Sequence, residues 1–155
     1  MAELRLVPDE FDVPAGLRTA RFTLEPLGVR HNASDHSAWM SSIDHIRRTP
    51  GFPGRTWPVA MSLTENAADL AEHERDFAAR TGFTYTVLDP ASGEVIGCVY
   101  LYPARRAGYD VDVRSWVRAD RADLDQPLFE LVSGWLAERW PFTRPDYAAR
   151  PSGPP

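Results

Sequence analysis

Three consecutive segments in the middle of the chain have the hydrophobic patterns of β-strands, and in the third of them apolar and polar residues alternate. Short turns separate the segments, and an apolar pattern with helical spacing follows the third one. The predicted strands cover residues 83–90, 94–103 and 109–118, and the helix covers about 124–140. The second strand is apolar on both faces, so we expect it to lie in the centre of a sheet that is covered on both sides.

A second helix is predicted over residues 63–80, because Ser62 and Glu65 match the capping box S-x-x-E at its start. At about 100° per residue, the apolar residues of this helix gather into one stripe that should pack on the sheet. The stripe consists of Leu63, Ala67, Leu70, Ala71, Phe77 and Ala78. Glu74 falls inside this stripe, so we expect its carboxylate to be buried and its pKa to be raised.

The remaining segments are shorter. We predict a strand over 21–27, a helix over 35–46, a loop rich in proline and glycine over 49–59, and an edge strand over 144–149. Residues 1–20 read as an irregular leader and residues 151–155 as a disordered tail. The length of the chain fits one α/β (α+β) domain, which we place at 21–150.

Composition excludes several classes of protein. The net charge of -5 and the pI near 5.3 argue against a nucleic-acid-binding protein. We find no apolar run long enough to span a membrane and no apolar segment typical of a signal peptide, so we expect a cytoplasmic protein. Cys98 is the only cysteine, which excludes an intrachain disulfide, and its place in the middle of a strand predicts a buried thiol.

The element order resembles that of the Gcn5-related N-acetyltransferases (GNAT), and three short motifs strengthen the resemblance to small bacterial members. These are Trp57-Pro58 before the helix, Asp69-Leu70 with His73 and Phe77 within it, and GCVYLYP at 97–103. The resemblance covers about 21–147. It implies a mixed, mostly antiparallel sheet flanked by helices on both sides, and acetyl-CoA as the co-substrate.

In that family the end of the third strand pairs with pantetheine, which implicates the main chain of Ser115, Trp116 and Val117. The sheet would splay there and leave an open seam for the thioester arm. A glycine-rich loop would then hold the pyrophosphate on backbone N–H groups.

The loop of this chain departs from the family pattern, because 119–123 reads ADRAD and holds no glycine. Asp120 and Asp123 place negative charge where an anionic pyrophosphate would sit, and Arg118 and Arg121 would offset part of that repulsion. The helix and strand that end a typical member are also missing. Tyr147 is the only tyrosine after the last long helix, and it does not align with the family's acid.

Three residues are candidates for the general base that an amine acceptor needs. They are Glu74, His73, which Asp69 could orient from four residues earlier on the helix, and Asp112 on the third strand. For each, a structural ion pair or hydrogen bond is the alternative. Six aromatic residues could wall an acceptor pocket, with core packing as the alternative: Trp39, Phe52, Trp57, Tyr85, Tyr100 and Tyr102. No second histidine has metal-ligand spacing to His73, so we predict no metal site.

These observations predict an acyl-CoA-dependent N-acetyltransferase that acts on a small-molecule amine by direct attack on the thioester. Two alternatives stay open. The chain could be a GNAT-like module without catalysis that binds a ligand or a protein, for example as a homodimer along an exposed sheet edge. It could also be a different α+β fold with the same element order.

Overall fold

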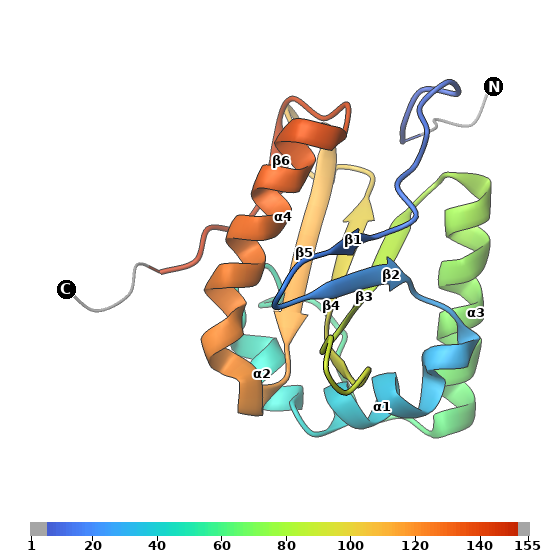
Figure 1. Ribbon diagram of the computed structural model, residues 1–155, viewed down its shortest axis with the longest axis vertical. Coiled ribbons are helices and arrows are strands. Elements are labelled where there is room, and N and C mark those ends of the chain that lie inside the picture. Colours follow the sequence, from blue (N-terminus) through green and yellow to red (C-terminus); the bar gives the residue numbers. More distant parts are fainter. Residues whose placement is uncertain (1–5, 152–155) are drawn as a thin grey trace.

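The computed structural model describes residues 6–151, which form one six-stranded sheet with helices on both faces (Figure 1). The strands lie in chain order across the sheet. They are β1 (Leu17–Arg18), β2 (Thr23–Pro26), β3 (Phe83–Leu88), β4 (Val95–Tyr102), β5 (Val111–Val117) and β6 (Pro145–Tyr147). All neighbours are antiparallel except β5 and β6, which run parallel. The predicted mixed, mostly antiparallel α/β sheet is therefore confirmed.

The helices occupy both faces of this sheet. They are α1 (Asn32–Met40), α2 (Ile43–Arg48), α3 (Leu63–Ala79) and α4 (Asp125–Arg139), with short 3₁₀ turns η1 (Val29–His31) and η2 (Ala119–Leu124). Figure 1 shows α4 on one side of the strands and α3 on the other.

The single helix expected over 35–46 is instead two helices. The break lies at Ser41 and Ser42, where the Ser41 hydroxyl donates to the Ala38 carbonyl and competes with the helical backbone bonds.

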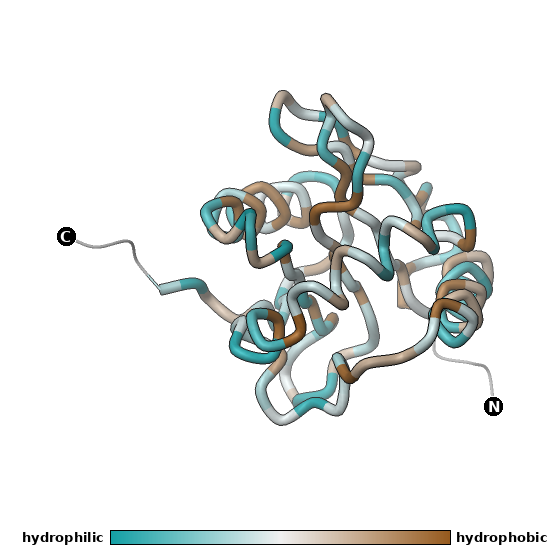
Figure 2. Tube along the Cα trace, turned by 90° about the horizontal axis from the view of Figure 1, so that it is seen from below, coloured by the Kyte–Doolittle hydropathy of each residue, from teal (hydrophilic) through white to brown (hydrophobic). Residues whose placement is uncertain are grey.

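The two faces of the sheet carry two separate apolar clusters. Val99, Val113 and Val117 of the central strands point to α4. Cys98, Tyr100 and Trp116, on the alternate positions, point to α1, α2 and the loop that follows them. Period-two alternation thus assigns each face its own partner helices, and β4 is buried on both faces as predicted. Figure 2 shows hydrophilic and hydrophobic residues alternating along the helices, as expected of helices with one covered face.

Helix α3 begins with the predicted capping box, in which Ser62 and Glu65 each bond the other's backbone N–H. Its buried face, however, is rotated from the predicted stripe. Asn66 and Leu70 are buried, whereas Leu63 is 49% exposed. The prediction differs from the structure because it counted only apolar residues as buried. Asn66 is polar and was therefore left out of the predicted core.

The leader packs on the domain more closely than predicted, and its last residues contribute strand β1. Val7 is buried, and the Arg80 guanidinium donates to the carbonyls of Pro8 and Phe11. The tail predicted over 151–155 lies outside the described residues except for Pro151. No helix within residues 6–151 is long and apolar enough to cross a membrane.

Candidate functional site

A pocket of about 360 Å³ lies on the face of the sheet that α1 and α3 cover. Its walls combine aromatic rings with carboxylates, one histidine and one arginine. The lining includes Asp35, Trp39, Trp57, Asp69, Glu72, His73, Asp76, Tyr100, Tyr102 and Arg114. Aromatic faces and carboxylates both attract ammonium groups, so the pocket suits a small amine.

His73 enters this pocket from α3, and its hydrogen bonds run through one ring nitrogen. Nδ1 lies 2.9 Å from the Tyr102 hydroxyl and 3.0 Å from Thr84 Oγ1. The Tyr102 hydroxyl donates its proton to Asp76 at 2.8 Å, so its oxygen can only accept from the imidazole. We therefore assign the proton to Nδ1, which leaves the lone pair on Nε2. Burial lowers the pKa of His73, so the ring is neutral at pH 7.

Asp35 is a second titratable group of the pocket, and no pattern in the sequence pointed to it. The side chain is 4% exposed and accepts a hydrogen bond of 3.0 Å from Asn66 Nδ2. Asn66 in turn accepts from the Trp39 indole, which ties α1 to α3. Burial raises the pKa of Asp35 to about 6, a property that we had expected of Glu74.

The expected burial of Glu74 is wrong, because the side chain is exposed and points away from the pocket. Its carboxylate accepts from the Val29 N–H at 2.6 Å and ties η1 to α3. The rotation of the α3 face explains the difference, since it brings His73 to the pocket and turns Glu74 out of it.

Asp112 is buried as the third-strand candidate, but it does not line the pocket. Arg55 donates to both of its carboxylate oxygens, at 3.1 and 3.3 Å. Arg114 Nε lies 3.6 Å from one of the same two oxygens. Two guanidinium groups thus hold this carboxylate in an ion-pair network outside the pocket.

The residues expected to bind pantetheine border a seam, which we define as the space between Ser115–Val117 and residues 148–150. Pairing between β5 and β6 stops at Val113 and Tyr147, as a splayed sheet requires. The Arg150 guanidinium fills the space beyond. It donates to the Ser115 carbonyl at 2.8 Å, to Asp125 of α4 at 2.8 Å, and to the Pro50 carbonyl of the loop on the opposite face at 3.3 Å.

The expectation of an open seam is therefore wrong for this conformation. The Arg150 side chain is only 1% exposed, and the Tyr147 hydroxyl bonds Ser115 Oγ at 2.5 Å. Trp116 and Val117 are buried, and the Trp116 indole donates to the Tyr100 hydroxyl at 2.9 Å. Burial raises the pKa of Tyr147 to about 12.

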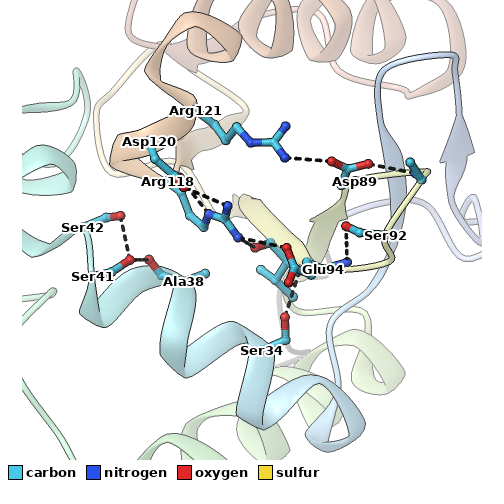
Figure 3. Close-up of polar contacts among 12 residues, drawn as sticks. Ser34, Ala38, Ser41, Ser42, Asp89, Ser92, Glu94, Arg118, Asp120 and Arg121 are labelled. Atoms are coloured by element: carbon cyan, nitrogen blue, oxygen red, sulfur yellow. Dashed lines mark hydrogen bonds and ion pairs between the residues drawn. The ribbon is translucent and has the colours of Figure 1, made fainter.

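The region expected to hold pyrophosphate is a network of ion pairs (Figure 3). Arg118 pairs with Asp120 at 2.9 Å and with Glu94 at 3.7 Å, and Arg121 pairs with Asp89 at 2.9 Å. The Ala119 N–H, at the start of η2, is already bonded to Ser42 Oγ. Two guanidinium groups and three carboxylates leave this network with a net negative charge, so it has no free cation for a phosphate. The residues expected to hold acetyl-CoA thus do not form an open site.

Comparison with known proteins shows which solved structures share this architecture. No family model matches the sequence, and no curated protein matches it. Among solved structures, a protein assigned as a ribosomal-protein-serine acetyltransferase from Vibrio cholerae superposes with a TM-score of 0.65 at 14% identity, over 94% of this chain and 76% of that one. The microcin C7 self-immunity acetyltransferase, solved with acetyl-CoA and AMP, gives 0.63 at 12% identity, over 81% and 67%.

A third match is assigned to the GNAT-family acetyltransferases of Bordetella pertussis, with a TM-score of 0.58 at 19% identity, over 80% and 71% of the two chains. The chain has the GNAT fold. Identities this low show the fold alone, so the activity has to be argued from the side chains described above.

The sequence pointed to His73 and Asp69 of this pocket and to four of its aromatic residues, Trp39, Trp57, Tyr100 and Tyr102. It missed Asp35 and Arg114, which come from α1 and β5 and meet only in the folded chain. No short motif joins them. The alternation along β4 and β5 was the one available signal, because it puts Tyr102 and Arg114 on the same face of the sheet.

Proposed function

We propose that the chain is an acyl-CoA-dependent N-acetyltransferase whose amine acceptor binds in the pocket under α1 and α3. The observation that carries this proposal is the neutral His73, which has a free Nε2 in a pocket lined by carboxylates and aromatic rings. The GNAT fold supports acyl transfer as the reaction class.

Each group of the pocket has a task in this scheme. Asp69, Glu72 and Asp76 attract the ammonium form of the acceptor, and the indole rings of Trp39 and Trp57 wall it. An ammonium ion has no lone pair, so it must lose a proton before it attacks a thioester. His73 Nε2 accepts that proton, and Tyr102 with Asp76 stabilises the imidazolium that forms through Nδ1.

Acetyl-CoA would supply the acetyl group, and its pantetheine would have to approach Ser115, where Arg150 now sits. The proposal therefore requires the 148–150 segment to move away from β5. Loss of the Arg150–Asp125 pair opposes this movement, since a buried charge would lose its partner.

The test is an acetylation assay with acetyl-CoA and a panel of small primary amines. Product is detected as acetylated amine by mass spectrometry and as free CoA thiol. We expect both signals to depend on the amine. Absence of acetylated product for every amine, together with no binding of acetyl-CoA at millimolar concentration, would overturn the proposal.

The filled seam favours a second candidate function, a GNAT-fold module that binds an amine ligand without catalysis. This module could act as a single chain or pair with a second copy along an exposed sheet edge. Its pocket would work as described, and the Arg150 network would be permanent. Titrations of the protein with the same amines and with acetyl-CoA separate the two functions, since amine binding without acetyl-CoA binding is the result that the second one predicts.

A further inference from the structure

Arg114 is a mostly buried guanidinium that no other described residue satisfies with a hydrogen bond. Its side chain is 18% exposed, and its buried Nε has no hydrogen-bond partner. Asp112 is the nearest carboxylate, but it lies 3.6 Å from Nε and is already bonded twice by Arg55. Among residues 6–151, Arg114 thus has a long ion pair with Asp112, and its buried Nε–H has no hydrogen-bond acceptor.

The plane of this guanidinium is nevertheless fixed. Its central carbon lies 4.9 Å from the centre of the Tyr100 ring and 5.4 Å from that of Phe52. Stacking on aromatic rings holds an arginine in one orientation, and a held guanidinium presents two parallel N–H donors to a carboxylate. Buried polar groups in folded proteins are nearly always bonded, so donors that are held in place and open indicate a missing partner.

The same pocket carries the opposite charge on the side of α3. Asp69, Glu72 and Asp76 line it together with Arg114. The guanidinium is close enough to His73 for its charge to help lower the pKa of the imidazole. A pocket of about 360 Å³ is at the small end of ligand sites, which span roughly 300–1,000 Å³.

We propose that the ligand of this pocket is a small zwitterion of amino-acid size, with its carboxylate on Arg114 and its ammonium group toward the carboxylates of α3. This inference rests on the proposed function only in naming the acceptor of the same pocket. It does not require acetyl-CoA to bind. A plain amine would leave the guanidinium without a hydrogen-bond acceptor, so the site discriminates against it.

The test compares amino acids with their decarboxylated amines in calorimetric titrations without acetyl-CoA. Suitable pairs are L-phenylalanine with phenethylamine, L-lysine with cadaverine, and L-methionine with 3-(methylthio)propylamine. We expect the amino acid of at least one pair to bind about 10- to 100-fold more tightly, the range of a hydrogen bond to a charged group. Equal or tighter binding of the amine in every pair, or no binding by any compound at 10 mM, would overturn the inference.

Two variants locate the discrimination. Arg114→Gln should abolish the preference for the carboxylate, and Arg114→Lys should keep only part of it because an ammonium group lacks the fork. Arg75→Gln removes the same charge from an exposed position of α3 and should keep the full preference. A preference that survives Arg114→Gln would contradict the proposal. If Arg114→Gln does not fold, the comparison on the wild-type protein still decides.

The two proposals fail in different ways. Amino acids that bind through Arg114 but are never acetylated would refute the transferase and leave the zwitterion site standing. Acetylation of plain amines with no preference for a carboxylate would refute the zwitterion site and leave the transferase standing.

Discussion

His73 and Glu74 are neighbours on α3 but face different surroundings. His73 reaches into the pocket and bonds Tyr102, whereas Glu74 is exposed and caps η1. One helical step of about 100° separates a candidate base from a structural carboxylate. The two residues therefore form a matched pair for testing which of them takes part in the reaction.

We expect His73→Gln to lower kcat by roughly 100-fold or more, the usual contribution of a general base, and Glu74→Gln to leave kcat near that of the wild type. Glutamine at 74 still offers an oxygen to the Val29 N–H. Because burial lowers the pKa of His73, the wild-type rate should fall only below about pH 6.5, where an ordinary imidazole titrates. Steady-state kinetics over pH 5–9 checks both points. A loss of activity in Glu74→Gln alone would restore Glu74 as the base.

Asp35 makes a prediction about stability rather than activity. Its pKa rises from 3.8 to about 6 on folding, so the native state is stabilised by protonation. This contribution is fully present below pH 3.8 and is lost as the pH rises through 6. Asp35→Asn, which keeps an acceptor for Asn66, should therefore be more stable than the wild type above pH 6, by up to about 3 kcal/mol. The advantage should vanish near pH 4.

Urea unfolding at pH 4 and at pH 8 measures this difference. Asp123→Asn removes a carboxylate at an exposed position and serves as the control, with little expected change at either pH. Equal stability of Asp35→Asn and the wild type at pH 8 would show that Asp35 does not carry a buried charge.

At the scale of elements, the junction of β5, β6 and α4 decides whether the seam opens. Arg150 joins all three parts, because it bonds Ser115 of β5, Ala148 after β6 and Asp125 of α4. Under the proposed function, a pantetheine arm would need the Ser115 main chain and the space that Arg150 fills. The proposal therefore implies that the arginine and the arm exclude each other.

We expect Arg150→Met to strengthen acetyl-CoA binding by about 10- to 100-fold, since the arm no longer displaces a charge-assisted hydrogen bond. The same change should lower the stability of the free protein by roughly 2–4 kcal/mol, because Asp125 loses its partner. Isothermal titration and thermal melting measure the two effects. Arg139→Met, an exposed arginine at the end of α4, is the control. Unchanged affinity in Arg150→Met would mean that the cofactor does not enter by the seam.

The sequence predicted elements better than it predicted their rotation. The alternation along β4 and β5 and the capping box of α3 are local signals, so the boundaries of these elements were close. The buried face of α3 was wrong because Asn66 enters the core through bonds to Trp39 and Asp35, which come from another helix. No pattern in the sequence indicated the role of Arg150 either. Its partners Asp125 and Ser115 lie 25 and 35 residues away along the chain.

At the scale of the whole molecule, the chain combines a GNAT fold with closed ion-pair networks at the residues that were expected to hold acetyl-CoA. One face of the sheet keeps a pocket with a free imidazole nitrogen and a guanidinium whose Nε has no hydrogen-bond partner. Ion pairs occupy the region where a glycine-rich loop was expected, and Arg150 fills the seam. The order of the elements along the chain was enough to predict the fold. It could not predict that the pocket is open and that the seam is filled.

The most direct test is a backbone and arginine side-chain NMR titration with acetyl-CoA. The account predicts shifts at the amides of Ser115, Val117 and Ala119, together with a shift of the Arg150 Nε–H as its bonds to Ser115 and Asp125 break. If acetyl-CoA at millimolar concentration moves none of these signals, the seam does not admit the cofactor and the proposed acetyl transfer is contradicted.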